Sequence, residues 1–157
     1  MSKFQLKNFF KAAYDLMLVF LQFFIISLHF FKWGFLPQKQ IIQANPYFYF
    51  LGILIIIIAF IIMLVSIKDL GRNLSPFPRP MNNSSLVTTG IYRFTRHPMY
   101  YSLIFISIGV FIIKLSIYYL ILTISLAIII KYKIALEEKY LMNKFKDYLL
   151  YKNKVKV

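Results

Sequence analysis

The sequence contains no cysteine, which excludes disulfide bonds, thiolate zinc sites and cysteine nucleophiles. Acidic side chains are scarce, because five Asp and Glu residues stand against 19 Lys and Arg residues and leave a net charge of +14. The apolar segments also lack the alternating pattern of barrel strands, so a segment that crosses lipid has to be a helix. We therefore expect a helical chain, and we predict no metal site.

Apolar residues dominate what is present. Hydrophobic residues occupy 60% of the 157 positions and aromatic residues 19%, whereas soluble domains are about 45–50% apolar. Four spans of roughly 20 residues each would use about half of this length. We predict one membrane-embedded domain over residues 1–157. The predicted spans lie at about 12–31, 47–67, 99–113 and 115–130.

Two apolar stretches define three of these spans. Residues Tyr47 to Ile67 form an uncharged run that is long enough to cross about 30 Å of hydrocarbon as a helix. Residues Met99 to Ile130 are apolar except for Lys114, which is too long for one helix and suits two short helices that turn near Lys114. The predicted fold class is all-α, an integral membrane bundle of about four spans whose last two form a helical hairpin.

The first predicted span contains polar residues within its apolar run. Asp15, Gln22 and His29 interrupt the apolar run from Ala12 to Phe31. The segment is too long and too aromatic for a removable signal peptide and lacks a small-residue cleavage site, so we expect it to remain as a span. Asp15 and His29 lie close to its ends, which favours roles as snorkelling or capping residues over a function inside the membrane.

Basic residues are distributed unevenly between the predicted spans. Sixteen Lys and Arg residues fall on one side and three on the other. This bias predicts that both termini and the 68–98 loop lie in the cytoplasm. A nucleic-acid partner is not expected, because the charge brackets long apolar runs instead of forming one solvated face. The expected partner is the lipid bilayer, whose anionic lipids attract such segments.

Three alternate prolines stiffen the polar loop after the second span. Each proline fixes its own φ and disfavours helix in the preceding residue, so the Pro76 to Pro80 stretch should be extended. A long polar loop with so little backbone freedom is often functional.

The same loop ends in Arg96, His97 and Pro98 at the start of the third span. Proline suits the first position of a helix. Free backbone amides and the positive end of the helix dipole are found there, so this site could hold a carboxylate together with Arg96. Taken alone, Arg96 is better explained as a juxtamembrane charge and His97 as a capping or loop residue.

An amphipathic helix is predicted to continue from the fourth span. Four apolar side chains share one helical face, and they belong to Ile134, Leu141, Phe145 and Tyr148. Glu138 projects from this face and Glu137 lies toward its edge. A carboxylate on a buried face needs a cationic or hydroxyl partner. The alternative is a solvated face in which Glu137 pairs with Lys133 four residues earlier.

Taken in order, these elements resemble the isoprenylcysteine carboxyl methyltransferases and the related phospholipid methyltransferases. The likeness runs from the second span to the end of the chain. It rests on Leu86-Val87, Gly90-x-Tyr92, Arg96-His97-Pro98-x-Tyr100, the hairpin, and Glu137-Glu138-x-x-Leu141-x-x-x-Phe145-x-x-Tyr148-x-x-Tyr151.

The resemblance implies an S-adenosylmethionine cofactor between the hairpin and the two polar segments, with a lipid-like or prenylated substrate that enters from the bilayer. The cofactor-binding residues that it implies are Leu86, Val87, Tyr92, His97, Pro98, Met99, Tyr100, Glu137 and Glu138. We hypothesise that Arg96 and His97 hold the charged tail of the cofactor and that Glu137 or Glu138 faces its ribose or ammonium. Arg96, His97 and Glu137 are the predicted catalytic residues, and Lys133 is the predicted substrate contact.

The sequence departs from the family pattern at four positions. Lys133 stands where an Arg often contacts substrate, and it keeps the charge without the planar two-pronged geometry. Ser102 and Lys146 stand where glycine is usual, and Ser84 stands where His is frequent. These changes concern the acceptor specificity more than the cofactor site.

Several alternatives remain open at this point. The favoured acceptor is an isoprenylcysteine-type carboxylate, which needs no general base. A phospholipid amine is the second acceptor and would need His97 or a Glu as base. A membrane sterol or enoyl reductase with NADPH ranks next, and a small non-enzymatic membrane protein that binds anionic lipid ranks last. The sequence does not predict the oligomeric state.

Overall fold

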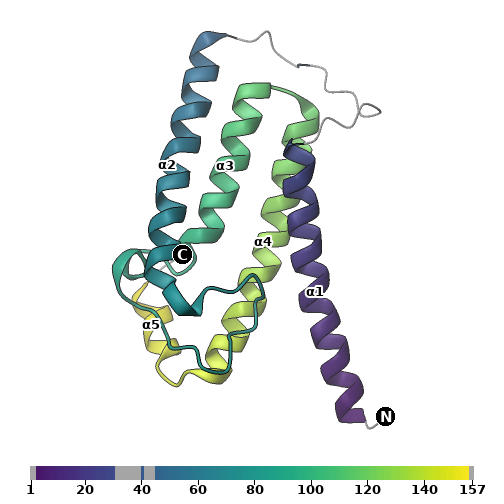
Figure 1. The fold of residues 1–157 in the computed structure, drawn as a ribbon, viewed down its shortest axis with the longest axis vertical. Coiled ribbons are helices and arrows are strands. Elements are labelled where there is room, and N and C mark those ends of the chain that lie inside the picture. The colour runs from purple at the N-terminus through teal and green to yellow at the C-terminus, as the bar shows by residue number, and fades with distance from the viewer. Residues whose placement is uncertain (1–2, 31–39, 41–44, 156–157) are drawn as a thin grey trace.

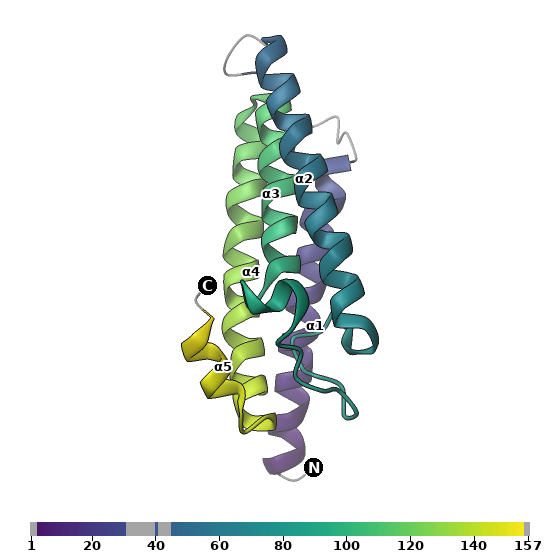
Figure 2. The same ribbon diagram turned by 90° about the vertical axis from the view of Figure 1, so that its left-hand side faces the viewer.

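The computed structural model describes residues 3–30, 40 and 45–155. Four long helices lie side by side, namely α1 (Lys3–Phe30), α2 (Pro46–Leu70), α3 (Pro98–Lys114) and α4 (Ile117–Lys144). A short α5 (Tyr148–Lys154) and two 3-10 segments, η1 (Gly71–Asn73) and η2 (Gly90–Arg93), gather at one end of the bundle, together with the loop between α2 and α3 (Figures 1 and 2). The predicted all-α fold class is confirmed.

Three of the helices, α1, α2 and α4, are long and apolar enough to cross a membrane, and α3 is a shorter apolar helix of 17 residues. At 1.5 Å per residue α3 is about 25 Å long, slightly less than the hydrocarbon thickness. The outer surface of α2 is apolar around its circumference, and Phe50 and Ile57 are 71% and 51% exposed. Such a surface is stable only in lipid, so the bundle is that of an integral membrane protein.

Small residues bring α2 and α3 close together. A Cβ atom on Gly52 would lie 2.7 Å from the Gly109 carbonyl oxygen, and one on Gly109 would lie 2.8 Å from the Gly52 carbonyl oxygen. Both distances are shorter than van der Waals contact. Glycine at both positions therefore permits the direct backbone contact that membrane helices use in place of a hydrophobic driving force.

The predicted hairpin turns where the sequence indicated. Helix α3 ends at Lys114, Leu115 adopts the left-handed conformation with φ of 45°, and Ser116 is the N-cap residue of α4. The core lies between α1, α3 and α4 on an apolar stripe of α4 at four-residue spacing, formed by Leu122, Leu126 and Ile130.

Helix α1 is joined to the hairpin by polar contacts inside the span. His29 Nε2 lies 2.7 Å from Ser107 Oγ, which lies 2.8 Å from Thr123 Oγ1. The Tyr118 hydroxyl donates to the Leu28 carbonyl oxygen at 3.0 Å. The expected capping role of His29 is confirmed, because its Nδ1 bonds to the Ile25 carbonyl oxygen in the last turn of α1 at 2.9 Å. Its Nε2 in addition joins α1 to α3. The helix also begins at Lys3, earlier than the predicted span start, and the predicted end at residue 31 lies outside the described residues.

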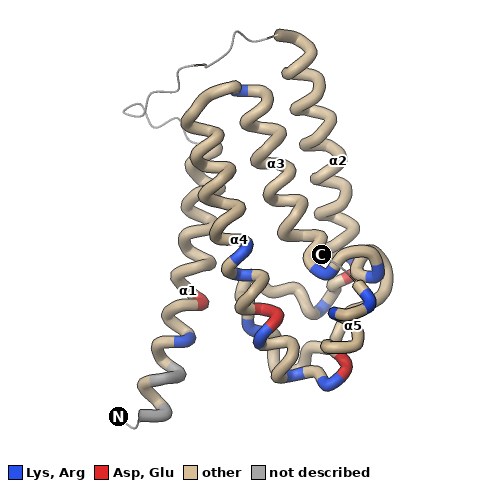
Figure 3. The backbone as a smooth tube through the Cα atoms, turned by 180° about the vertical axis from the view of Figure 1, so that it is seen from behind, with Lys and Arg blue, Asp and Glu red and all other residues tan. Residues whose placement is uncertain are grey.

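Charged residues gather at one end of the bundle (Figure 3). This end holds the α2–α3 loop, the polar half of α4 and α5, whereas Lys114 stands at the opposite end beside the hairpin turn. We call the charged end the polar end. By the positive-inside rule it faces the cytoplasm, and this orientation stays a prediction.

Candidate active site

A cleft opens at the polar end between the α2–α3 loop, the start of α3, the last turns of α4, and α5. It brings together segments that are far apart in the sequence. Eight of the residues predicted for the site line it, and these are Leu86, Val87, Tyr92, Arg96, His97, Met99, Tyr100 and Glu137.

The loop that forms one wall of the cleft is held by polar side chains of the loop itself and of α4. Asn73 Oδ1 accepts a hydrogen bond from the Ser85 backbone amide at 2.9 Å. The Lys144 ammonium donates to the Met81 carbonyl oxygen, to the Asn82 carbonyl oxygen at 2.9 Å and to Ser84 Oγ at 2.8 Å. The proline stretch is a series of bends without helix. Because both ends of the loop are fixed, Leu86 and Val87 reach the cleft.

Gly90 is required by a close approach of the backbone to Asp69. It has φ of 59°, and a Cβ atom there would lie 2.0 Å from Asp69 Oδ2. The same carboxylate oxygen accepts a hydrogen bond from the Ile91 amide at 2.8 Å. Any other residue would be strained and would displace this carboxylate. Gly90 thereby sets the position of Tyr92 in the cleft wall.

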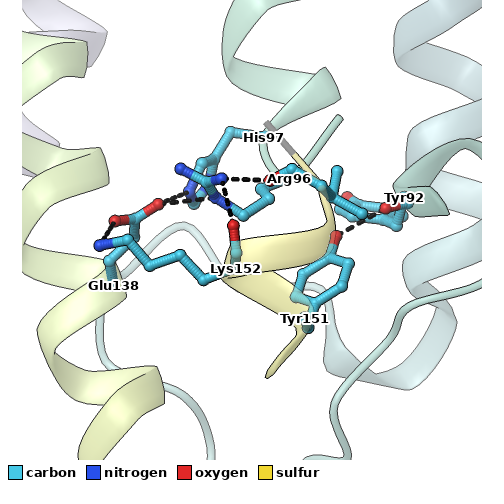
Figure 4. Close-up of polar contacts among 7 residues, drawn as sticks. Tyr92, Arg96, His97, Glu138, Tyr151 and Lys152 are labelled. Atoms are coloured by element: carbon cyan, nitrogen blue, oxygen red, sulfur yellow. Dashed lines mark hydrogen bonds and ion pairs between the residues drawn. The ribbon is translucent and has the colours of Figure 1, made fainter. Parts of the chain in front are cut away.

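Glu138 is the centre of an ion-pair cluster beside the cleft (Figure 4). Its Oε1 accepts from Arg96 Nε at 2.9 Å and faces His97 Nε2 at 3.3 Å, and its Oε2 lies 2.7 Å from Lys152 Nζ. Arg96 and His97 stand at the start of α3, where His97 is the N-cap and Pro98 follows in the first turn. The cluster therefore ties the start of α3 to α4 and α5.

Arg96 also holds the end of α5. Its Nη1 donates to the Lys152 carbonyl oxygen at 3.2 Å and to the Val155 carbonyl oxygen, and free carbonyls of this kind are usual at a helix C-terminus. The Tyr151 hydroxyl donates to the Tyr92 carbonyl oxygen at 2.6 Å. Helix α5 is thus fixed against the cleft at two points (Figure 4).

Two buried polar atoms of the cleft have no hydrogen-bond partner among the described residues. They are Glu137 Oε2 and the Tyr148 hydroxyl, and both residues line the cleft. The Tyr100 hydroxyl faces the Glu137 carboxyl, and Oε2 is the carboxyl oxygen without a partner. Burial raises the pKa of Tyr148, so its hydroxyl stays protonated at neutral pH. Unpaired buried groups of this kind are rare and indicate a missing ligand or water.

Three predicted site residues lie outside the cleft lining. Pro98 is fully buried beneath it, and Glu138 is engaged in the ion-pair cluster. The Lys133 ammonium is buried and donates to Gln22 Oε1 at 2.5 Å and to the Pro76 carbonyl oxygen at 3.0 Å. The assigned roles of these residues stay predictions, and Glu137 is the carboxylate that lines the cleft with an unpaired oxygen.

Sequence reasoning missed Tyr148 and Lys152 as site residues. The predicted amphipathic helix ends at Lys144, before Tyr148, and a turn at 145–147 leads into α5. This turn folds Tyr148 and Tyr151 back over the cleft, where a continuous helix would carry them away. The spacing of Phe145, Tyr148 and Tyr151 was visible, yet it fitted one helical face equally well.

The family departures are accommodated locally. Ser102 is buried, and its hydroxyl donates to the Pro98 carbonyl oxygen one turn earlier at 2.9 Å. Ser84 donates to the Met81 carbonyl oxygen at 2.8 Å, and Lys146 is exposed. None of the three introduces a buried polar atom without a hydrogen-bond partner among the described residues.

A family model described as phospholipid methyltransferase matches residues 47–148. The match covers α2, the loop, the hairpin and the start of α5, and it leaves α1 outside. Comparison with curated proteins found no match, and comparison with solved structures found none either. The resemblance found in the sequence is thereby confirmed, and the chain belongs to the phospholipid methyltransferase family.

Proposed function

We propose that this methyltransferase transfers a methyl group from S-adenosylmethionine to a lipid-like acceptor, with the cofactor held in the cleft. The observation that supports the proposal is the pair of buried atoms without partners, Glu137 Oε2 and the Tyr148 hydroxyl, in one cleft. Membership of a methyltransferase family favours this reaction over nicotinamide-dependent reduction and over a non-enzymatic role.

The residues present fit such a cofactor. The free oxygen of Glu137 can accept hydrogen bonds from an ammonium or from ribose hydroxyls, and the Tyr148 hydroxyl can donate to a carboxylate. Leu86, Val87 and Met99 supply apolar surface for an adenine ring. Glu138 holds Arg96 and His97 in the cleft wall, and binding of the charged tail of the cofactor by these two residues stays a prediction.

Methyl transfer requires the protein mainly to align the methyl donor with the acceptor. The bound cofactor supplies an electrophilic methyl group on a sulfonium. The cleft residues then have to orient the acceptor in line with that methyl group and exclude water. An amine acceptor must also lose a proton. We assign its removal to His97, because the imidazole lines the cleft and the contact of its Nε2 with Glu138 Oε1 at 3.3 Å orients the ring.

A phospholipid amine is the acceptor that the geometry favours. The ammonium of Lys133, expected to orient a carboxylate, is held by Gln22 and Pro76 and does not line the cleft. A carboxylate acceptor of the isoprenylcysteine type is the second candidate. The Arg79 guanidinium favours it, because this side chain lines the cleft and is 47% exposed.

Methyl transfer to a panel of acceptors tests both parts of the proposal. Purified protein in lipid nanodiscs receives a labelled methyl donor with either amine phospholipids or prenyl-cysteine compounds. We expect label in the amine phospholipids, a strong loss of label with His97→Ala, and wild-type transfer by the exposed control Asp147→Asn. Label in the prenyl-cysteine compounds alone would select the carboxylate reaction, and label in neither class would overturn the proposed function.

A further inference from the structure

Two polar residues of α1, the helix that the family match leaves out, are buried against the matched part of the chain. Asp15 is 4% exposed and Gln22 is 6% exposed. They are seven residues apart, which places both on one face of the helix. Polar groups inside a membrane bundle need partners, and the partners of these two residues lead to the cleft.

Gln22 is connected to the proline loop through Lys133. Its Oε1 accepts a hydrogen bond from the buried Lys133 ammonium at 2.5 Å, and the same ammonium donates to the Pro76 carbonyl oxygen at 3.0 Å. Lys133 Nζ also lies 5.2 Å from the centre of the Tyr100 ring, which lines the cleft. One α1 side chain thus fixes the first residue of the proline stretch.

Asp15 is connected to the other end of that stretch. Its Oδ2 lies 3.2 Å from Arg79 Nη2, and its two carboxylate oxygens accept from the Tyr140 hydroxyl at 3.1 and 3.3 Å. The Arg79 guanidinium also lies 5.3 Å from the centre of the Tyr140 ring. Between the two attachment points, Phe77 and Pro78 face the cleft.

We propose that Gln22 and Asp15 are positioning residues, which fix the Ser75–Pro80 wall of the cleft through Lys133 and Arg79 without touching a ligand. This inference rests on the proposed function, because the wall matters only if the cleft binds a cosubstrate. It also gives Lys133 a role that differs from substrate contact. Helix α1 is then a part of the active-site architecture that the segment matched by the family model does not contain.

Helix α1 has separate contacts at its other end, and these supply a matched control. His29 bonds to Ser107, and the Leu28 carbonyl oxygen accepts from Tyr118. Loss of Gln22 should therefore leave α1 docked while it frees the loop. Loss of His29 should weaken α1 packing by a similar amount and leave the loop fixed.

The test compares Gln22→Leu, Gln22→Glu and His29→Leu in the full-length protein. Two assays are used: steady-state kinetics, which give the KM and kcat for the methyl donor, and hydrogen exchange of the backbone amides in residues 74–85. We expect Gln22→Leu to raise the donor KM about tenfold with a smaller change in kcat, and to speed exchange of the loop amides about tenfold. Gln22→Glu keeps an acceptor for Lys133, so its donor KM and loop exchange rate should match those of the wild type. His29→Leu should also leave the donor KM and the loop exchange rate unchanged.

Each outcome decides the proposal. Equal effects of Gln22→Leu and His29→Leu on donor KM and loop exchange would mean that α1 acts only by packing, and the positioning role would be overturned. The positioning role would also be overturned if the loop amides of Gln22→Glu exchanged as fast as those of Gln22→Leu. If the wild-type protein neither binds nor uses the donor, the proposed function fails, while the exchange measurement still shows whether Gln22 holds the loop.

Discussion

The Glu138 cluster makes a quantitative prediction about stability. Glu138→Gln keeps the shape of the side chain and removes the charge that faces Arg96, His97 and Lys152. The Arg96 side chain is only 7% exposed, so its guanidinium would be left buried without a counter-charge. Breaking a buried pair in this way costs about 3–5 kcal/mol. Lys152 is one-third exposed, so the loss of its ion pair with Glu138 adds only on the order of 0–1 kcal/mol to the destabilisation.

We expect the lower end of this range, about 3 kcal/mol, because the cluster lies at the polar end and not in the lipid core. A loss of that size lowers the melting temperature by on the order of 10 °C for a chain of this length. The assay is thermal unfolding in detergent of the wild type, Glu138→Gln, Arg96→Gln and the double variant. The double variant should lose clearly less than the two single losses combined, because each single change removes the same contact. Additivity within about 0.5 kcal/mol would refute the cluster as a coupled unit.

Three further predictions concern the backbone and α5. Gly109→Ala places a Cβ atom against the Gly52 carbonyl oxygen and should destabilise the α2–α3 pair by about 1–3 kcal/mol, measured by thermal unfolding with exposed Ile57→Ala as control. Gly90→Ala displaces Asp69 and should weaken donor binding at least tenfold in a titration; unchanged affinity would show that Gly90 does not set the cleft wall. Tyr151→Phe removes the hydrogen bond to the Tyr92 carbonyl oxygen and should cost about 1 kcal/mol. Burial raises the pKa of Tyr151 to about 12 in the folded chain, against about 10 unfolded. The unfolded chain therefore loses this proton first, so the stabilisation is complete below pH 10 and is lost as the pH rises toward 12. Unfolding midpoints measured from pH 8 to 12 should fall less steeply for Tyr151→Phe than for the wild type.

The fold was predictable because its main determinant is local. Long apolar runs must form helices in lipid, and the single charge at Lys114 marked the hairpin turn. The ends of the helices were harder to predict from the sequence. Lys131 marks where the apolar run of α4 ends, but the helix continues to Lys144. Charged residues end the membrane-spanning part of a helix, whereas the helix itself can continue into water.

The site was predictable only in outline. The resemblance indicated that the start of α3 meets Glu137 and Glu138, and the structure brings these residues together. Neighbouring helical residues point about 100° apart, so the sequence alone did not show which carboxylate faces the cleft. The partners of Asp15 were equally hidden. Asp15 was expected to snorkel or cap, but it is buried against Arg79 and Tyr140. The sequence of a helix shows that a buried polar residue needs a partner, but it does not show which element provides that partner.

Binding of labelled S-adenosylmethionine to wild-type protein and to Glu137→Gln tests the central claim most directly. We predict saturable binding by the wild type and affinity at least tenfold weaker for Glu137→Gln, with Asp147→Asn as the exposed carboxylate control that binds like the wild type. The ligand-free Glu137→Gln protein should be at least as stable as the wild type, because the change replaces a buried ionisable carboxyl that has an unpaired oxygen with a neutral amide. If Glu137→Gln binds the cofactor as tightly as the wild type does, Glu137 does not face the cofactor and the proposed site is wrong.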